Sequence, residues 1–137
     1  MASGPSIESV MTSYPYSIEI DDHISSAKTM LAQFKIRHLP VKEGDKLVGV
    51  ITARDIERAE NCGIDTSIGS DIRVRKLHSK GVYVVAPGEP LVNVLNHMAD
   101  HYIGSVLIAR NGKLAGIFTF NDACRYCVGL LTGAKRG

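Results

Sequence analysis

The sequence has little that would mark an exported, membrane-bound or nucleic-acid-binding protein. Only three of its 137 residues are cysteine, and the formal net charge is +2 with both signs scattered along the chain. No basic stripe of the kind that contacts nucleic acid is present. With no run of eighteen apolar residues and no charged-then-apolar amino terminus, neither a membrane span nor a secretion signal is predicted. We therefore expect reduced thiols and a cytoplasmic protein.

Catalytic signatures are missing as well. The sequence has no Ser-His-Asp set, phosphate-loop glycine pattern or paired catalytic carboxylates. Cys124 and Cys127 have the spacing of a dithiol oxidoreductase or half a zinc site, but Cys124 lies about a turn inside a predicted helix and no second cysteine pair exists. His97 and His101 share one helix face without a third ligand. We predict no catalytic residue and no metal site, and interpret the two thiols as core or interface residues.

What the sequence does contain is a motif that occurs twice. Gly49-Val50-Ile51-Thr52-Ala53-Arg54-Asp55 returns as Gly116-Ile117-Phe118-Thr119-Phe120-Asn121-Asp122. In both copies a glycine opens a short apolar run, a threonine closes it, and an aspartate follows three residues later, where a helical pattern begins. Laying residue n on residue n+67 aligns the two halves without a gap from Tyr16/Tyr83 to Asp55/Asp122.

Hydrophobic periodicity predicts the same element order in each half: strand, helix, two strands, helix. The predicted strands are 16–20, 39–41, 47–51, 83–85, 105–109 and 114–118, and the predicted helices begin near residues 23, 53, 90 and 120. One such unit has too little core to fold alone, whereas two can cover each other's sheets. We predict an α/β (α+β) fold of two β-α-β-β-α repeats packed sheet-to-sheet about a pseudo-twofold axis. The predicted boundaries are a flexible lead-in at 1–8, repeats at 9–62 and 77–131, a connector at 63–76 and a tail at 132–137.

The chemistry of the Thr-x-x-Asp pairs has two interpretations. At the start of a helix, free backbone amides favour an anion, a threonine hydroxyl can donate to a phosphate, and a carboxylate can accept from two ribose hydroxyls. The pattern also matches a capping box, in which both side chains satisfy backbone amides and bind nothing. Aspartate is one carbon shorter than the glutamate of that box, which counts against capping. Local sequence alone leaves both interpretations open.

The wider motifs resemble a known family. His38-Leu39-Pro40-Val41 and residues 46–55, with their counterparts at 104–108 and 113–122, resemble tandem cystathionine-β-synthase (CBS) domains, also called a Bateman module. The resemblance covers about Ser9 to Leu130. It implies a regulatory module, not an enzyme, that binds adenosine compounds such as AMP, ADP, ATP or S-adenosylmethionine. It also implies that bound ligand alters contacts with a regulated protein that the sequence does not identify.

The resemblance also implies roles for individual residues. Asp55 and Asp122 would hold the ribose hydroxyls, and Thr52 and Thr119 would face the phosphates. The adenine would lie against strand residues and near the backbone of His38 or Ser105; these strand residues are Tyr16, Ile18, Leu39 and Pro40 in one site and Tyr83, Val85, Val106 and Leu107 in the other. Arg54 puts a cation where the second motif has neutral Asn121, so we expect the first site to favour more charged nucleotides.

Members of the family form flat homodimers through the helices that a single module leaves uncovered, and we expect the same here by resemblance. The chain has apolar positions beyond the needs of one small core, namely Ala59, Cys62, Tyr126, Cys127, Leu130 and Leu131. Two other functions stay open: a ligand-free scaffold for dimerisation or protein contact, and a thiol oxidoreductase that uses Cys124 and Cys127.

Overall fold

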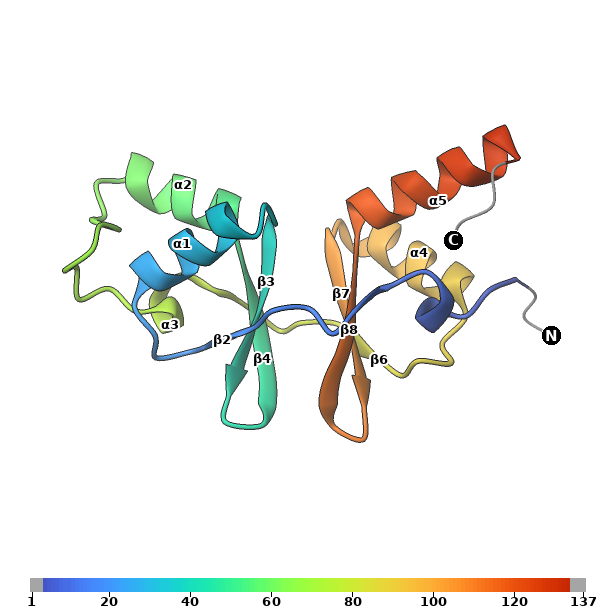
Figure 1. Cartoon of the computed structure of the whole chain (residues 1–137), viewed down its shortest axis with the longest axis horizontal. Coiled ribbons are helices and arrows are strands. Elements are labelled where there is room, and N and C mark those ends of the chain that lie inside the picture. The colour runs from blue at the N-terminus through green and yellow to red at the C-terminus, as the bar shows by residue number, and fades with distance from the viewer. Residues whose placement is uncertain (1–3, 134–137) are drawn as a thin grey trace. The chain divides into compact units, whose positions relative to one another are not determined.

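The computed structural model describes residues 4–133, which form two units (Figure 1). The first unit is Tyr16–Val82. The second unit combines the segment that ends at Pro15 with the chain from Tyr83 onward. The extremes of the predicted lead-in and tail, residues 1–3 and 134–137, lie outside the described residues. None of the helices in the described part has the length and apolar character needed to span a lipid bilayer.

The first unit contains one four-stranded sheet in the order β2-β3-β4-β5. Strand β2 runs parallel to β3, and the other neighbours are antiparallel. The elements are β2 (Ile18–Glu19), α1 (Ile24–Gln33), β3 (His38–Glu43), β4 (Lys46–Thr52), α2 (Ala53–Asn61), α3 (Val74–Leu77) and β5 (Ser79–Lys80). Figure 1 shows α1 and α2 on one face of this sheet.

The second unit repeats this arrangement with the sheet order β6-β7-β8-β1. Its elements are the 3-10 helix η1 (Ile7–Ser9), β1 (Thr12–Ser13), β6 (Val84–Val85), α4 (Leu91–His101), β7 (Ser105–Arg110), β8 (Lys113–Thr119) and α5 (Phe120–Thr132). Asn111 and Gly112 form the tight turn between β7 and β8 with φ of 55° and 78°, as the Asn-Gly pair predicts. The predicted α+β class and the β-α-β-β-α order of both repeats are confirmed.

The edge strands β1 and β5 were not predicted, and they extend the repeat upstream of Tyr16. Thr12 pairs with Ile117, and Ser79 pairs with Val50. The two pairs are equivalent, because Ser79 follows Thr12 by 67 residues and Ile117 follows Val50 by 67 residues. The segment 9–15, which the sequence places with the first repeat, therefore supplies a strand to the second unit. Ile7, within the predicted flexible lead-in, is fully buried, and its amide donates to the carbonyl of Glu89 at 2.8 Å.

Each sheet has an apolar core on the side of its helices. The first contains Ile18, Ile20, Ile24, Ala27, Leu31, Leu39, Val41, Ile51, Ile56 and Val74. The second contains Ile7, Val10, Leu91, Val94, Met98, Val106, Ile108, Ala115 and Phe118. Burying one such aliphatic side chain contributes roughly 1.5–3 kcal/mol, so these clusters hold each helix pair against its sheet.

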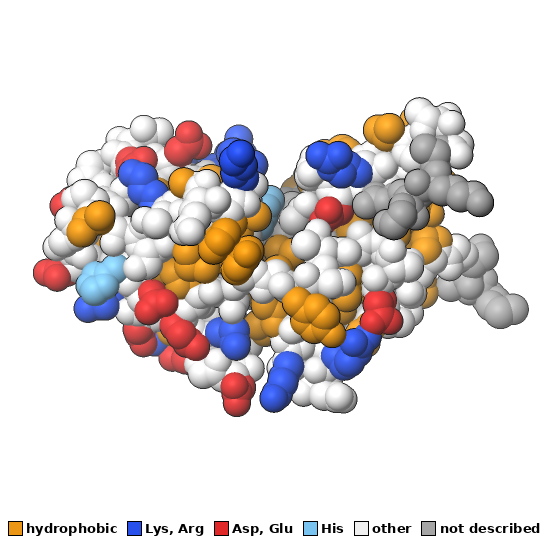
Figure 2. Space-filling model, in the orientation of Figure 1, with side chains coloured by type: hydrophobic (Ala, Val, Ile, Leu, Met, Phe, Trp, Pro, Cys, Tyr) orange, Lys and Arg blue, Asp and Glu red, His pale blue; other side chains and the backbone are white. Residues whose placement is uncertain are grey.

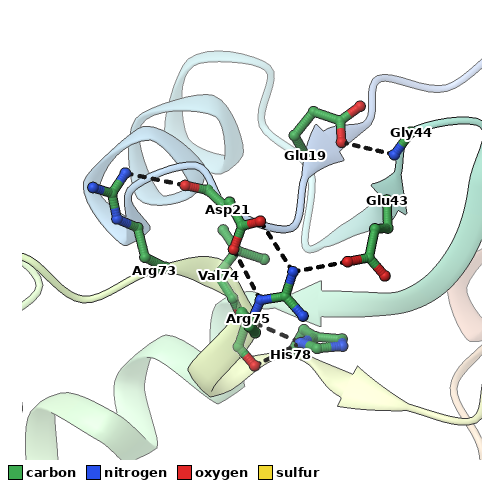
Figure 3. A network of polar contacts seen from close by, with 8 residues as sticks. All are labelled: Glu19, Asp21, Glu43, Gly44, Arg73, Val74, Arg75 and His78. Atoms are coloured by element: carbon green, nitrogen blue, oxygen red, sulfur yellow. Dashed lines mark hydrogen bonds and ion pairs between the residues drawn. The ribbon is translucent and has the colours of Figure 1, made fainter.

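An exposed ion-pair network fixes α3 beside the sheet of the first unit (Figure 3). The Arg75 guanidinium donates to both carboxylate oxygens of Asp21 at 2.9 and 3.0 Å and to Glu43 at 2.8 Å. The bond from Arg75 holds the pKa of the Asp21 carboxyl below its ordinary value, and both carboxylates raise the pKa of Arg75. Nδ1 of the buried His78 lies 3.3 and 3.1 Å from the carbonyl oxygens of Val74 and Arg75, so it is the protonated nitrogen that donates there.

Candidate functional site

The first Thr-x-x-Asp motif lies where β4 ends and α2 begins. Thr52 is extended and caps the helix, and its hydroxyl oxygen accepts from the Asp55 amide at 3.0 Å. Asp55 Oδ2 in turn accepts from the Thr52 amide at 2.9 Å. The capping box is therefore complete. The expectation that aspartate is too short to reach back is wrong, because the amide of the extended cap residue lies within reach of the first helical turn.

The second motif forms the same box between β8 and α5, with two additional bonds. The Asp122 amide donates to the Thr119 hydroxyl at 3.3 Å, and the Thr119 amide donates to Asp122 Oδ2 at 2.9 Å. The Thr119 hydroxyl lies 3.1 Å from the same oxygen, and the Thr12 hydroxyl from β1 lies 3.5 Å from Asp122 Oδ1. Both carboxylate oxygens of Asp122 therefore have partners within the unit.

The two motifs have the same backbone arrangement but differ in the hydrogen bonds of their aspartate and threonine side chains. Asp55 Oδ1 has no hydrogen-bond partner within residues 4–133, and the proton of the Thr52 hydroxyl is not directed at its own aspartate. Asp55 and Asp122 are both half-buried. Only the first motif therefore has an uncommitted carboxylate oxygen and an uncommitted hydroxyl donor side by side. Thr12 was missed in the sequence, although continuing the 67-residue offset upstream pairs it with Ser79, a second hydroxyl residue.

The amides at the two helix starts are already partly used. The Ala53 amide donates to the carbonyl of Arg37 and the Phe120 amide to that of Gly104, each at 3.0 Å. Together with the capping bonds, these leave fewer free donors for an anion than a helix start usually offers. Any ligand here would therefore depend on side chains such as Thr52 and Asp55 more than on the backbone.

The strand residues expected to contact an adenine differ in accessibility. Ile18, Leu39 and Val106 belong to the helix-side cores, and Pro40 and Leu107 are also buried, so their side chains can shape a site only from beneath its surface. His38, Tyr83, Val85 and Ser105 are half-buried, and Tyr16 is 52% exposed. The Tyr16 ring stacks on Phe34 at 3.7 Å, whereas Tyr83 stacks on His97 at 3.7 Å. Arg54 and Asn121 are exposed at the second position of their helices.

The cysteines and histidines lie apart from these motifs. Cys124 and Cys127 are exposed on α5, so the interpretation of these thiols as core residues is wrong and the interpretation as interface residues stays open. Cys124 is the fifth residue of α5, beyond the turn in which a helix stabilises a thiolate. His97 and His101 stack with ring centroids 4.1 Å apart. Within residues 4–133, no three His, Cys, Asp or Glu side chains are grouped to hold a metal ion.

Comparisons with known proteins identify the family of the two repeats. The family model for the CBS domain matches twice, at residues 7–61 and 74–129. The chain is 37% identical over 119 residues to an inosine-5′-monophosphate dehydrogenase of Thermoplasma acidophilum, which covers 84% of this chain and 22% of that enzyme. It spans about a fifth of the length of such curated relatives.

Solved structures show the same fold. The CBS domain pair of protein MJ0100, in complex with 5′-methylthioadenosine and S-adenosylmethionine, superposes with a TM-score of 0.80 at 24% identity, over 92% of this chain and 98% of that one. The protein CBSX2, in complex with AMP, superposes with a TM-score of 0.77 at 20% identity, over 93% and 99%. The two matches of the family model begin 67 residues apart, which is the offset that relates the two halves of the sequence. The chain therefore belongs to the CBS domain family and carries two CBS domains in tandem.

Proposed function

We propose that this chain is a regulatory, non-catalytic module that binds an adenosine compound, AMP, ADP, ATP or S-adenosylmethionine, and changes its contacts with a regulated protein when the ligand is bound. The observation that carries the proposal is the uncommitted Asp55 Oδ1 beside the uncommitted hydroxyl of Thr52. The carboxylate oxygen can accept hydrogen bonds from ribose hydroxyls, and the threonine hydroxyl can donate one to a phosphate oxygen. The adenosine ligands of MJ0100 and CBSX2 support this ligand class.

In the first unit, Asp55 Oδ1 accepts from the ribose hydroxyls while Oδ2 keeps its bond to the Thr52 amide. The Thr52 hydroxyl donates to a phosphate oxygen, and the exposed Arg54 supplies a cation nearby. Tyr16, half-exposed and stacked on Phe34, offers a rigid aromatic face for the adenine. The backbone at His38 reads the base edge, and the buried residues Ile18, Leu39 and Pro40 support the strands beneath.

The second unit offers an equivalent but weaker site. A ribose at Asp122 has to displace the hydroxyls of Thr12 and Thr119 from the carboxylate, and Asn121 provides no positive charge. The base would lie near Tyr83, Val85 and Ser105, above the buried Val106 and Leu107. We therefore place the tighter binding in the first unit, with a preference for the more highly phosphorylated nucleotides.

Calorimetric titration with AMP, ADP, ATP and S-adenosylmethionine tests this proposal. Asp55→Ala removes charge-assisted hydrogen bonds worth roughly 1.5–3 kcal/mol, so affinity at the tighter site should fall by about one to two decades. Asp122→Ala is the matched control, because it removes the same kind of capping bond, worth about 1 kcal/mol of stability, from the other unit. The control should keep the tighter site. Its melting curve should show a loss of stability at least as large as that of Asp55→Ala, because Asp122 also accepts from the hydroxyls of Thr12 and Thr119.

The complete capping boxes favour a second candidate function, a ligand-free scaffold. If none of the four compounds produces a saturable heat, or if Asp55→Ala binds as tightly as the parent, the motifs serve only as helix caps. In that case both alanine variants would change thermal stability alone.

A further inference from the structure

Three sulfur-containing side chains line one groove of the second unit. The groove lies between α4 and α5 and encloses about 790 Å³. Met98 comes from α4, and Cys124 and Cys127 come from α5. Because the methionine is far from the two thiols in sequence, only the fold shows that the three side chains share one surface.

The two thiols are neighbours on one helix face. Both are exposed and free, and residues three positions apart on a helix have Cβ atoms about 5–6 Å apart. Two metal–sulfur bonds of about 2.3 Å each, the length of a zinc–thiolate bond, reach across up to about 4.6 Å between sulfur atoms. Rotation of the two cysteine side chains about χ1 can therefore bring both sulfur atoms onto one ion.

Met98 supplies a third sulfur from deeper in the groove. Its side chain is only 5% exposed and belongs to the apolar cluster of this unit. Methionine is unbranched and flexible, and its thioether is polarizable and donates an electron pair without losing a proton. A buried thioether below two exposed thiols gives an ion ligands from two helices.

The rest of the groove favours a soft ion. Eleven residues line it, and the eight besides the sulfur-containing three are all uncharged, with Leu95, Ile103 and Phe120 among them. Hard cations such as Mg²⁺ and Ca²⁺ bind through oxygen, and zinc requires four ligands of the cysteine, histidine or carboxylate kind. The eleven residues supply neither set. Thiolate and thioether ligands select Cu(I), and surroundings of low polarity strengthen the attraction between a cation and its thiolates.

We propose that Cys124, Cys127 and Met98 form a binding site for one Cu(I) ion, held by two thiolates and one thioether. The two thiol protons pass to water as the two metal–thiolate bonds form, because a thiol must be deprotonated to bind a metal. The thioether adds its electron pair, and no electron is transferred, so copper stays in the same oxidation state. The site uses no residue of the Thr-x-x-Asp motifs and does not depend on nucleotide binding.

The first unit shows that the backbone does not require these sulfur atoms. Its groove between α1 and α2 encloses about 550 Å³, and each of the ten residues that line it has a counterpart 67 positions later in the lining of the sulfur-containing groove. At the positions of the three sulfur-containing residues, the first unit has Leu31, Glu57 and Glu60. Lys28 pairs with Glu60 there at 2.5 Å, and Figure 2 shows side chains of both charges over α1 and α2. The packing of a helix pair on its sheet therefore does not explain why the second unit has two thiols and a thioether in one groove.

The first test is anaerobic titration of the reduced full chain with Cu(I) in competition with a chromophoric Cu(I) chelator. The parent should bind one ion per chain. Cys124→Ser with Cys127→Ser should lower the affinity by about 100-fold or more, and Met98→Leu by about 10-fold or more, because loss of a direct ligand should cost at least as much as loss of an outer-shell partner. Cys62→Ser is the matched control, since it removes the exposed thiol of the first unit and should leave the affinity unchanged.

The variants are chosen so that folding does not obscure the result. The two serine substitutions are at exposed positions, and Met98→Leu nearly conserves volume and introduces the residue that the first unit has at this position. Unchanged circular dichroism without copper would show that each variant folds. Equimolar Zn²⁺ should not displace Cu(I), because the groove lacks two of the four ligands that zinc requires.

The second test observes the thioether directly by X-ray absorption at the copper edge. The chain has four methionines, and all of them are replaced by selenomethionine for this measurement. Copper bound to the labelled parent should have one selenium neighbour, and this neighbour should be missing in Met98→Leu. A methionine with a purely structural role would give no copper–selenium signal. A parent that does not bind Cu(I), affinity that survives the double serine substitution, displacement of Cu(I) by equimolar Zn²⁺, or bound copper without a selenium neighbour would each overturn the inference.

Discussion

The two motif glycines should respond differently to the same substitution, with a loss of stability at Gly49 and almost none at Gly116. Gly49 and Gly116 occupy equivalent positions in β4 and β8, and both are buried. A methyl group at Gly49 would lie 2.3 Å from the backbone oxygen of Ser79 and 2.4 Å from the ring of the buried His78. At Gly116 its three nearest atoms would all belong to the side chain of Met11, with the sulfur at 2.2 Å. Backbone and an anchored ring cannot move aside, whereas a methionine side chain can.

These contacts set the size of the effect. Overpacking that forces backbone to shift costs about 1–3 kcal/mol, while replacing glycine by alanine inside a strand returns about 0.5–1 kcal/mol. Gly49→Ala should therefore lose about 1–2 kcal/mol of the free energy of unfolding, which for a chain of this size lowers Tm by roughly 3–8 °C. Gly116→Ala should stay within about 0.5 kcal/mol of the parent, because the gain offsets the cost of moving Met11.

Urea unfolding and thermal melting of the two variants measure this difference directly. Two further variants separate the causes. Met11→Ala should remove any remaining cost of Gly116→Ala, whereas His78→Ala should rescue Gly49→Ala only in part, because the Ser79 carbonyl stays in place. Equal losses at the two glycines, or a larger loss at Gly116, would refute the reasoning and show that the β4–β5 edge yields as easily as a side chain.

Two further predictions concern local features. The hydrogen bond from Arg75 lowers the pKa of Asp21 in the folded protein. The ion pair should therefore stabilise the fold fully at a pH above the pKa of Asp21 in the unfolded chain, about 3.9, and this stabilisation should disappear as the pH falls through the folded pKa. The free energies of unfolding of the parent and Asp21→Asn, measured in urea, should therefore differ at pH 7 and converge as the pH falls through the lowered folded pKa of Asp21. A difference that does not shrink as the pH falls below the unfolded value would contradict the ion-pair explanation. Gly112→Ala forces a side chain into a residue with φ of 78° and should cost about 1 kcal/mol, whereas Gly88→Ala, with open space and no left-handed φ, should be neutral in the same melts.

Much of the fold could be predicted because the repeats carry strong local patterns. The helices α2 and α5 begin directly after Thr52 and Thr119, as the repeated motif predicts. The Asn-Gly turn between β7 and β8 follows from two residues that tolerate positive φ. These features depend on neighbours in sequence, so they survive in any tertiary context.

What could not be predicted depends on contacts between segments far apart in the chain. Strands β1 and β5 have two residues each, which is too short for an alternating pattern, and Thr12 reaches its sheet only by pairing with Ile117. The state of the Asp122 carboxylate was hidden for the same reason, because one of its partners is 110 residues away. The exposure of Cys124 was likewise hidden, since helical spacing shows which residues share a face but not what that face contacts.

The two repeats share one backbone arrangement but differ in their polar and charged side chains. In the first unit, Asp55 Oδ1 and the Thr52 hydroxyl stay uncommitted, whereas both carboxylate oxygens of Asp122 in the second unit already have partners. The helices differ as well: Lys28, Lys35, Arg37, Glu57 and Glu60 of the first unit are replaced by Leu95, Tyr102, Gly104, Cys124 and Cys127 in the second. A nucleotide that needs a free carboxylate oxygen and a nearby cation should therefore bind the first unit more tightly, and Asp55→Ala should lower its affinity more than Asp122→Ala does.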